Sequence, residues 1–136
     1  MAARTKARKR ALDILFESEI QGIEPGAALA RRRTDATSRP GDYAVSLVEG
    51  VAAHRDRIDE LLSAYAVGWT IDRMPAVDRN VLRIAAYEIF YQDDVPDAVA
   101  ISEAVKMVRE LSTDESPAFV NGLLARLVDI KPSLSR

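Results

Sequence analysis

The stretch SPAFVNGLLARLV, residues 116–128, decides the fold because it joins a helix start to a long apolar face. Ser116 has the side chain of an N-cap, and Pro117 suits the first helical position. Asp114 and Glu115 precede it, where the positive end of the helix dipole favours acids. At about 100° per residue, the stretch therefore predicts an amphipathic helix. Its apolar face is formed by Val120, Leu123, Leu124, Leu127 and Val128.

The opposite side of this helix carries the small residues Ala118, Gly122 and Ala125. A row this small lets another backbone come close, and Gly122 costs roughly 1 kcal/mol against alanine in mid-helix. Packing on that side would explain the cost, so we predict a central helix with neighbours on both faces. Phe119 and Asn121 lie between the two faces and become the functional question.

Helical periodicity dominates the rest of the chain as well. No stretch alternates with period two for long enough to predict a strand. The sequence predicts an all-α fold of about six or seven helices in a single domain that spans residues 1–136. The expected helices are Arg4 to Gln21 with Gly22 as its stop, a short one from Pro25, one from Tyr43 that bends or continues near Gly50 and closes at Gly68, Ala76 to Tyr91, one from Asp97, and the one from Ser116.

Composition indicates a globular protein of a reducing compartment. About half of the residues are hydrophobic and 29% are charged, which is typical of a folded chain. Cysteine is absent, which excludes disulfides and thiolate chemistry. No run of 18 apolar residues occurs, and acids interrupt the segment after the basic N-terminus, so we expect no membrane span or signal peptide. A cytoplasmic location is the expectation.

Charge is distributed unevenly although the formal net charge is only −2. Five of the 19 basic residues lie within residues 1–10, which hold no acid, so the rest of the chain carries 14 basic against 21 acidic side chains. Such an end predicts a local anion site, and Arg4 and Arg8 align with the apolar stripe of their helix. A second basic run, Arg31 to Arg33, lies in a segment with the composition of a loop and is more typical of a solvated face.

Catalytic motifs are missing. The single His54 has no Cys and no second His to complete a metal site, and it is expected at the surface or the core edge. No phosphate-binding loop or nucleophile elbow is present, so neither a metal nor a cofactor is expected. Binding remains, and RNA recognition commonly stacks bases on aromatic rings. Phe119 can serve in this way, although periodicity alone favours core filling, and for Asn121 it favours a structural role.

Several segments together resemble the NusB family of bacterial transcription antitermination factors, nearly end to end and in order. The segments that carry the resemblance are Lys6 to Leu12, Trp69 to Arg79, Val81 to Glu88, Val95-Pro96 with Val99 to Val105, and Phe119 to Leu124.

The resemblance implies a fold of two small helical bundles and a factor without catalysis. It implies a partnership with NusE, which doubles as a small-subunit ribosomal protein, and joint binding of box A RNA in nascent ribosomal RNA transcripts. Through other Nus factors, this binding keeps elongating RNA polymerase from terminating. A homodimer that covers the RNA surface also occurs in the family, and the sequence does not decide the oligomeric state.

Site residues follow from the resemblance alone. The basic N-terminus matches the RNA-binding segment, Phe119 matches an aromatic on the RNA surface, and Glu115 and Ser116 border that surface. Asp78 matches an acidic position on the NusE side. The implied RNA-binding residues are Arg4, Lys6, Arg8, Lys9, Arg10, Glu115, Ser116 and Phe119.

Two departures and two rival functions stay open. Arg31 to Pro40 is shorter and more basic than the family pattern, and Pro117 replaces a residue that can be polar. An RNA cytosine methyltransferase can carry a NusB-like domain ahead of its catalytic part, but no cofactor-binding half follows before Arg136. A DNA-binding regulator is disfavoured because no helix-turn-helix with a basic recognition helix is apparent.

Overall fold

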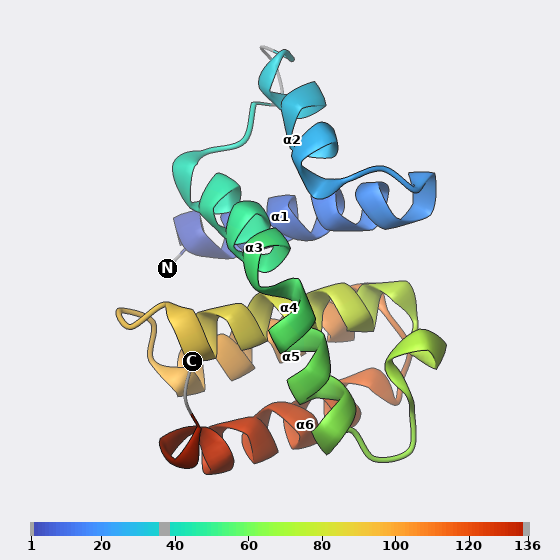
Figure 1. Cartoon of the computed structure of the whole chain (residues 1–136), viewed down its shortest axis with the longest axis vertical. Coiled ribbons are helices and arrows are strands. Elements are labelled where there is room, and N and C mark those ends of the chain that lie inside the picture. Colours follow the sequence, from blue (N-terminus) through green and yellow to red (C-terminus); the bar gives the residue numbers. More distant parts are fainter. Residues whose placement is uncertain (1, 36–38, 135–136) are drawn as a thin grey trace. The chain divides into compact units, whose positions relative to one another are not determined.

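A computed structural model describes residues 2–35 and 39–134, and within these ranges every regular element is helical. This confirms the all-α prediction. Figure 1 labels the α-helices, and two short 3-10 turns, η1 (Ile71–Arg73) and η2 (Lys131–Ser133), accompany them. The helices are α1 (Ala2–Gln21), α2 (Pro25–Arg33), α3 (Asp42–Tyr65), α4 (Ala76–Tyr91), α5 (Asp97–Leu111) and α6 (Ser116–Ile130).

The helices group into two units, as the family resemblance implies. Unit 1 ends at Ala53 and unit 2 begins at His54. Helix α3 continues from one unit into the other, and His54 interrupts it with φ −112° and ψ 15°. Of the two alternatives left open near Gly50, a bend or a continuation, the structure has a bend, and it lies four residues further along the chain at His54.

In unit 1, α1 packs against α2 through a buried stripe that includes Ile14, Leu15 and Leu29. The predicted loop at Arg31 to Arg33 is wrong at its start, because these arginines form the last turn of α2. Cations suit the negative end of a helix, and Arg32 adds an ion pair of 2.7 Å to Glu17 of α1. Residues 36–38 of the predicted loop lie outside the described residues.

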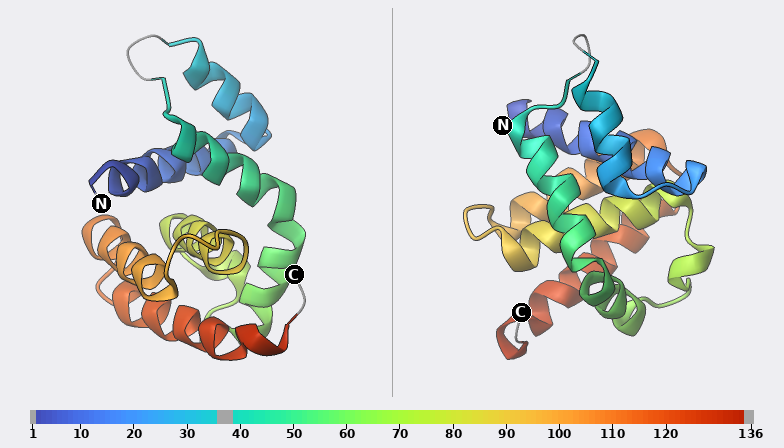
Figure 2. Two further views of the ribbon diagram at one scale, coloured as in Figure 1. Left: turned by 90° about the vertical axis from the view of Figure 1, so that its left-hand side faces the viewer. Right: turned by 45° about the horizontal axis from the view of Figure 1, so that its top comes forward.

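In unit 2, α4, α5 and α6 pack side by side (Figure 2). Eleven of the sixteen residues of α4 are buried, from Asp78 to Phe90, so α4 is the central helix of this unit. Helix α6 buries only one face, whereas Ala118 and Ala125 are exposed. A Cβ atom on Gly122 would meet only Arg126 Nη1, at 3.5 Å. The prediction of neighbours on both sides of this helix is wrong for the described chain.

Helices α5 and α6 run antiparallel and are fastened at both ends. Lys131 Nζ lies 2.9 Å from Asp97 Oδ1 at one end, and Ser116 Oγ donates to Ser112 Oγ over 3.2 Å at the other. Ser116 is the first helical residue rather than the predicted N-cap, a position that Glu115 occupies. The hydroxyl of Ser116 instead joins α6 to the end of α5.

Candidate nucleic-acid interface

Arginines of α1 lie against an aromatic ring of α3. The guanidinium carbon of Arg4 stands 4.3 Å from the centre of the Tyr43 ring, and that of Arg8 stands 5.9 Å away. Arg8 is only 2% exposed, while Arg4 is half-buried. Cations over an aromatic face are held by its quadrupole. Arg4 and Arg8 thus fix the start of α1, and Arg8 presents almost no surface to a ligand.

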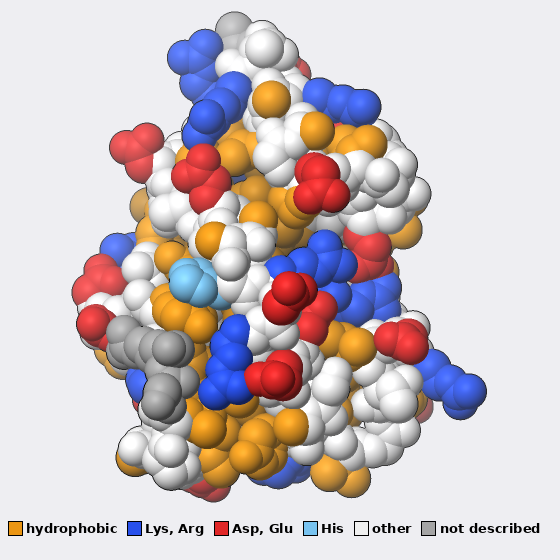
Figure 3. All heavy atoms as spheres, viewed as in Figure 1, with side chains coloured by type: hydrophobic (Ala, Val, Ile, Leu, Met, Phe, Trp, Pro, Cys, Tyr) orange, Lys and Arg blue, Asp and Glu red, His pale blue; other side chains and the backbone are white. Residues whose placement is uncertain are grey.

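The other basic residues of α1 reach solvent to different degrees. Lys6 is exposed, and Lys9 and Arg10 are half-buried. All three lie away from the buried stripe that contains Ala11, Leu12 and Ile14. On the face drawn in Figure 3, acidic and basic side chains alternate instead of separating into large areas. Because residues 1–10 hold five basic residues and no acid, the start of α1 is a local source of positive charge.

Phe119 is half-buried and packs on Trp69, which follows α3. The ring centres are 4.8 Å apart and the ring planes meet at 63°, an edge-to-face contact. Core filling, favoured by periodicity alone, accounts for only part of this side chain, because Phe119 is half-buried and part of its surface stays accessible. The contact of Trp69 with Phe119 was missed by periodicity, since Trp69 lies in a linker 50 positions away.

Residues bordering Phe119 divide into exposed acids and a buried hydroxyl network. Asp114 and Glu115 are exposed, whereas Ser116 is fully buried. Ser116 Oγ lies 2.8 Å from Thr113 Oγ1 and also accepts the Thr113 backbone N–H at 3.3 Å. The hydroxyl of Ser116 is thus occupied inside the protein, and its predicted contact with RNA stays a prediction.

The same network ends on Asp78. Ser112 Oγ donates to Asp78 Oδ1 over 2.5 Å, and Asp78 is 0% exposed. Because a carboxylate only accepts, the protons run from Thr113 through Ser116 and Ser112 to Asp78. Asp78 Oδ2 is buried without a hydrogen-bond partner among the described residues. Asp78 therefore joins the start of α4 to the end of α5, and its contact with NusE stays a prediction.

An ion pair between a buried arginine and a partly exposed aspartate was also missed by the sequence analysis. Arg83 of α4 is 5% exposed and forms two hydrogen bonds to Asp59 of α3, 2.8 Å from Nε to Oδ1 and 3.0 Å from Nη2 to Oδ2. Its Nη1 donates to Asn80 over 3.2 Å. The pair spans 24 positions, so no local pattern announces it. Its role is to bind α4 to the second half of α3.

His54 lies at the core edge, as predicted. Its ring stacks on Tyr91 with centres 3.9 Å apart and an angle of 15°, and Tyr87 extends the stack. Burial raises the pKa of the Tyr87 phenol above its ordinary value of 10.0. Among the described residues no three His, Cys, Asp or Glu side chains are grouped as metal ligands. None of the described helices is long and apolar enough to cross a membrane.

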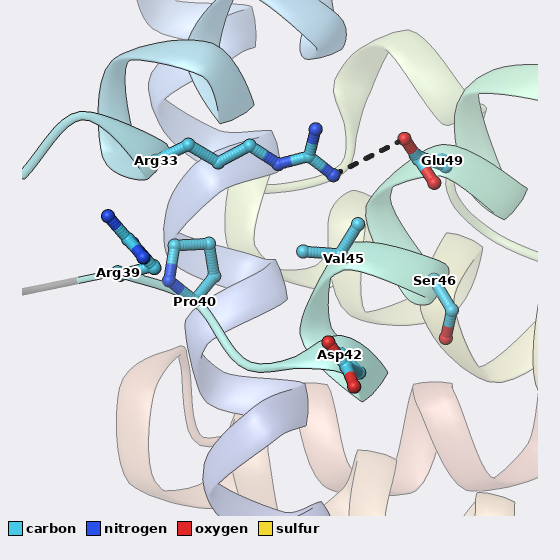
Figure 4. Close-up of a pocket in the computed structure, with 7 residues that line it drawn as sticks. All are labelled: Arg33, Arg39, Pro40, Asp42, Val45, Ser46 and Glu49. Atoms are coloured by element: carbon cyan, nitrogen blue, oxygen red, sulfur yellow. Dashed lines mark ion pairs between the residues drawn. The ribbon is translucent and has the colours of Figure 1, made fainter.

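A pocket of about 450 Å³ lies in unit 1 between the end of α2 and the start of α3 (Figure 4). Arg33 reaches across it to Glu49, with 3.6 Å between Nη2 and Oε2. Figure 4 shows Arg39 pointing away from Asp42 and Ser46. The two arginines therefore do not converge, which agrees with a solvated face rather than an anion site.

Comparison with known proteins extends over nearly the whole chain. Residues 5–129 match the model of the NusB family. The transcription antitermination protein NusB of Nocardioides sp. is 58% identical over 135 residues, which cover 99% of this chain and 100% of that protein. The NusB of Thermobifida fusca is 56% identical over 133 residues, covering 98% of this chain and 94% of the relative.

Solved structures agree with these relatives. NusB of T. maritima superimposes with a TM-score of 0.80 at 31% identity, covering 96% of this chain and 97% of that one. The structure of antitermination factors NusB and NusE in complex with dsRNA gives 0.82 at 25% identity, covering 95% and 98%.

Proposed function

The chain belongs to the NusB family of transcription antitermination proteins, and on that premise we propose that it binds box A RNA of nascent ribosomal RNA transcripts together with NusE. Its effect is processive elongation by RNA polymerase in the cytoplasm, with other Nus factors taking part indirectly. The observation that carries this proposal is the likeness over nearly the full chain to a NusB that was solved with NusE and dsRNA.

Catalysis has no part in the proposed function. The curated relatives are named for transcription antitermination and not for a reaction, in agreement with the expectation of a non-enzymatic factor. The rival assignment, the N-terminal domain of an RNA cytosine methyltransferase, loses support because the relatives at 58% and 57% identity are named transcription antitermination proteins.

RNA would meet two groups of side chains with different tasks. Lys6, Lys9 and Arg10 contribute positive charge for phosphates, which supplies affinity that weakens with salt. Phe119 offers the accessible part of its ring to an unpaired base, with Trp69 holding the ring in place. Arg4 and Arg8 contribute indirectly, because their contacts with the Tyr43 ring fix the start of α1.

NusE completes the RNA surface in this proposal. The basic segment is short and the rest of the chain is acidic, so RNA binding by the chain alone should be weak. Two acidic residues are assigned to these surfaces. Glu115, which is exposed beside the start of α6, borders the RNA surface, and Asp78 in α4 belongs to the NusE side.

Fluorescence anisotropy with a labelled box A RNA and a scrambled RNA of the same length tests the proposal. We expect weak binding by the chain alone, and tighter, box A-selective binding once NusE is added. Equal affinity for both RNAs, with and without NusE, would refute it.

A further inference from the structure

An open groove in unit 2 has no role in the proposed function. It lies between the antiparallel helices α5 and α6 and encloses about 370 Å³. None of the residues assigned to RNA or NusE lines it. The lining residues are Ala98, Ile101, Ser102, Val105, Lys106, Arg109 and Asn121.

The floor of the groove is a second apolar stripe on α5. The first stripe, which includes Ala104 and Val108, is buried against the neighbouring helices. Ala98, Ile101 and Val105 follow one another at spacings of three and four, so they share a different flank of the helix. Ile101 and Val105 are half-buried and Ala98 is exposed. Part of the apolar surface of α5 between Ala98 and Val105 therefore remains open to solvent.

On its α6 side, the groove is bordered by short side chains. Asn121 is exposed at its edge, and Ala118 and Ala125 are exposed on the adjoining outer face of α6. Short side chains allow a packed helix to approach closely.

Asn121 and Phe119 lie on opposite edges of α6. Two residues apart on a helix means about 200° of rotation. Phe119 packs on Trp69, while Asn121 faces α5. A ligand in the groove therefore leaves the accessible side of Phe119 unoccupied.

The rim of the groove is basic, although the chain beyond residues 1–10 carries more acidic than basic side chains. Lys106 and Arg109 are both exposed, and Lys106 keeps one hydrogen bond of 3.1 Å to Glu103 of its own helix. The floor offers no aromatic ring on which a base could stack, which disfavours single-stranded nucleic acid. Apolar floor and basic rim together match an acidic amphipathic helix.

We propose that the groove between α5 and α6 docks an acidic amphipathic helix of a partner protein. The partner helix lays apolar residues at spacings of three and four on Ile101 and Val105, and its carboxylates face Arg109 and Lys106. Asn121 can donate and accept hydrogen bonds at the margin. The surface is separate from the one proposed for RNA, and the proposal does not depend on RNA binding.

A titration of the ¹⁵N-labelled full chain, followed by NMR, tests this proposal. The probe is a helical peptide with leucine at spacings of three and four and glutamate elsewhere. Its twin carries lysine in place of every glutamate. We expect saturable shifts at Ala98, Ile101, Val105 and Asn121 with the acidic peptide, and much weaker ones with the basic twin.

Variants locate the binding. Arg109→Glu should lower the affinity for the acidic peptide about fivefold to tenfold, since one attraction between charges becomes a repulsion. Arg73→Glu, a matched exposed control in η1, should leave its affinity unchanged. Ser102→Trp should abolish binding by filling the groove, and it alters an exposed residue that is outside the buried core.

Four outcomes would overturn the proposal. They are no saturable shift at millimolar acidic peptide, equal affinity for the acidic and basic peptides, groove shifts with box A RNA in place of the peptide, and self-association of the chain through the groove in sedimentation equilibrium. The last two would assign the surface to a nucleic acid or to a second copy.

Discussion

Asp78 shows how a residue assigned to a partner by resemblance can be occupied inside its own protein. Its carboxylate ends a chain of three hydroxyls that joins α4, α5 and α6. Each hydroxyl donates toward the carboxylate, and such a network is stronger than its separate bonds because each bond polarises the next. The network thereby joins the start of α4, the end of α5 and the start of α6 at one point.

A double-mutant cycle on Asp78→Ala and Ser112→Ala measures this bond. We expect each single variant to lower the free energy of unfolding by about 1–3 kcal/mol, because a buried polar group loses its partner. Urea unfolding gives the values, and Asp72→Ala, at an exposed position, serves as the control. Additive changes in the free energy of unfolding would contradict the network. An unchanged affinity of the folded variant for NusE would mean that Asp78 has a structural role only.

Phe119 combines packing with an accessible ring, and the two roles can be separated. Phe119→Leu keeps an apolar contact with Trp69, so we expect a stability loss below about 1.5 kcal/mol. It removes the stacking surface, which should weaken RNA binding by about 1–3 kcal/mol per stacked base. Anisotropy with box A RNA and NusE measures the loss, and Phe119→Tyr should retain affinity. Equal affinity of the leucine variant would place the base elsewhere.

The basic side chains of helix α1 differ in exposure, and this difference decides which of them are suitable for a binding test. Arg8 is a poor target for a binding test, since its burial makes a loss of folding and a loss of contact indistinguishable. Lys6→Glu combined with Arg10→Glu should weaken RNA binding. It should also flatten the slope of log affinity against log salt by about 1.4, at about 0.7 for each lost contact to single-stranded RNA. Anisotropy at several salt concentrations measures the slope.

The control for α1 changes the same number of charges elsewhere. Arg39→Glu with Arg73→Glu replaces two exposed arginines outside α1. An identical slope change in both double variants would mean that net charge, rather than a site on α1, attracts the RNA.

Helix α6 offers a test of its own outer face. Gly122→Ala should raise the free energy of unfolding by about 1 kcal/mol, because alanine is the better helix former and its Cβ meets only Arg126 Nη1, at the ordinary contact distance of 3.5 Å. The midpoint of urea unfolding measures the change, with Ala118→Gly as the reverse substitution on the same face. Destabilisation by the alanine would show that something packs closely on Gly122 in solution.

Periodicity predicted the elements well and their surroundings less well. The helix from Ala76 to Tyr91 is confirmed to the residue because Pro75 and the break after Tyr91 are local signals. The row Ala118, Gly122 and Ala125 was misread because small residues permit close packing without requiring it. Partners such as Asp59 for Arg83 lie far apart in the chain, and a single sequence carries no local trace of them.

At the scale of the whole molecule, the two units share one helix. Before His54, α3 carries the buried residues Leu47, Val48 and Val51, and after it Ile58 and Leu62. We therefore expect that loss of unit 2 removes the support of the second half of α3, and that fraying from there reaches residues that unit 1 needs. This coupling is the physical basis for predicting one cooperative domain rather than two independent ones.

Leu82→Ala in α4 tests that coupling. Leu82 is 0% exposed, and removing its side chain should cost about 2–5 kcal/mol of stability through the cavity left behind. If the chain unfolds as one domain, native-state hydrogen exchange should accelerate equally for the slowest amides of α4 and for those of α1 near Ile14. Ala27→Gly, on an exposed position of α2, serves as the control and should speed exchange near its own helix only. Faster exchange confined to unit 2 in the Leu82 variant would mean that the interruption of α3 at His54 uncouples its two halves. Each unit would then have to maintain its part of the RNA and partner surfaces through its own stability.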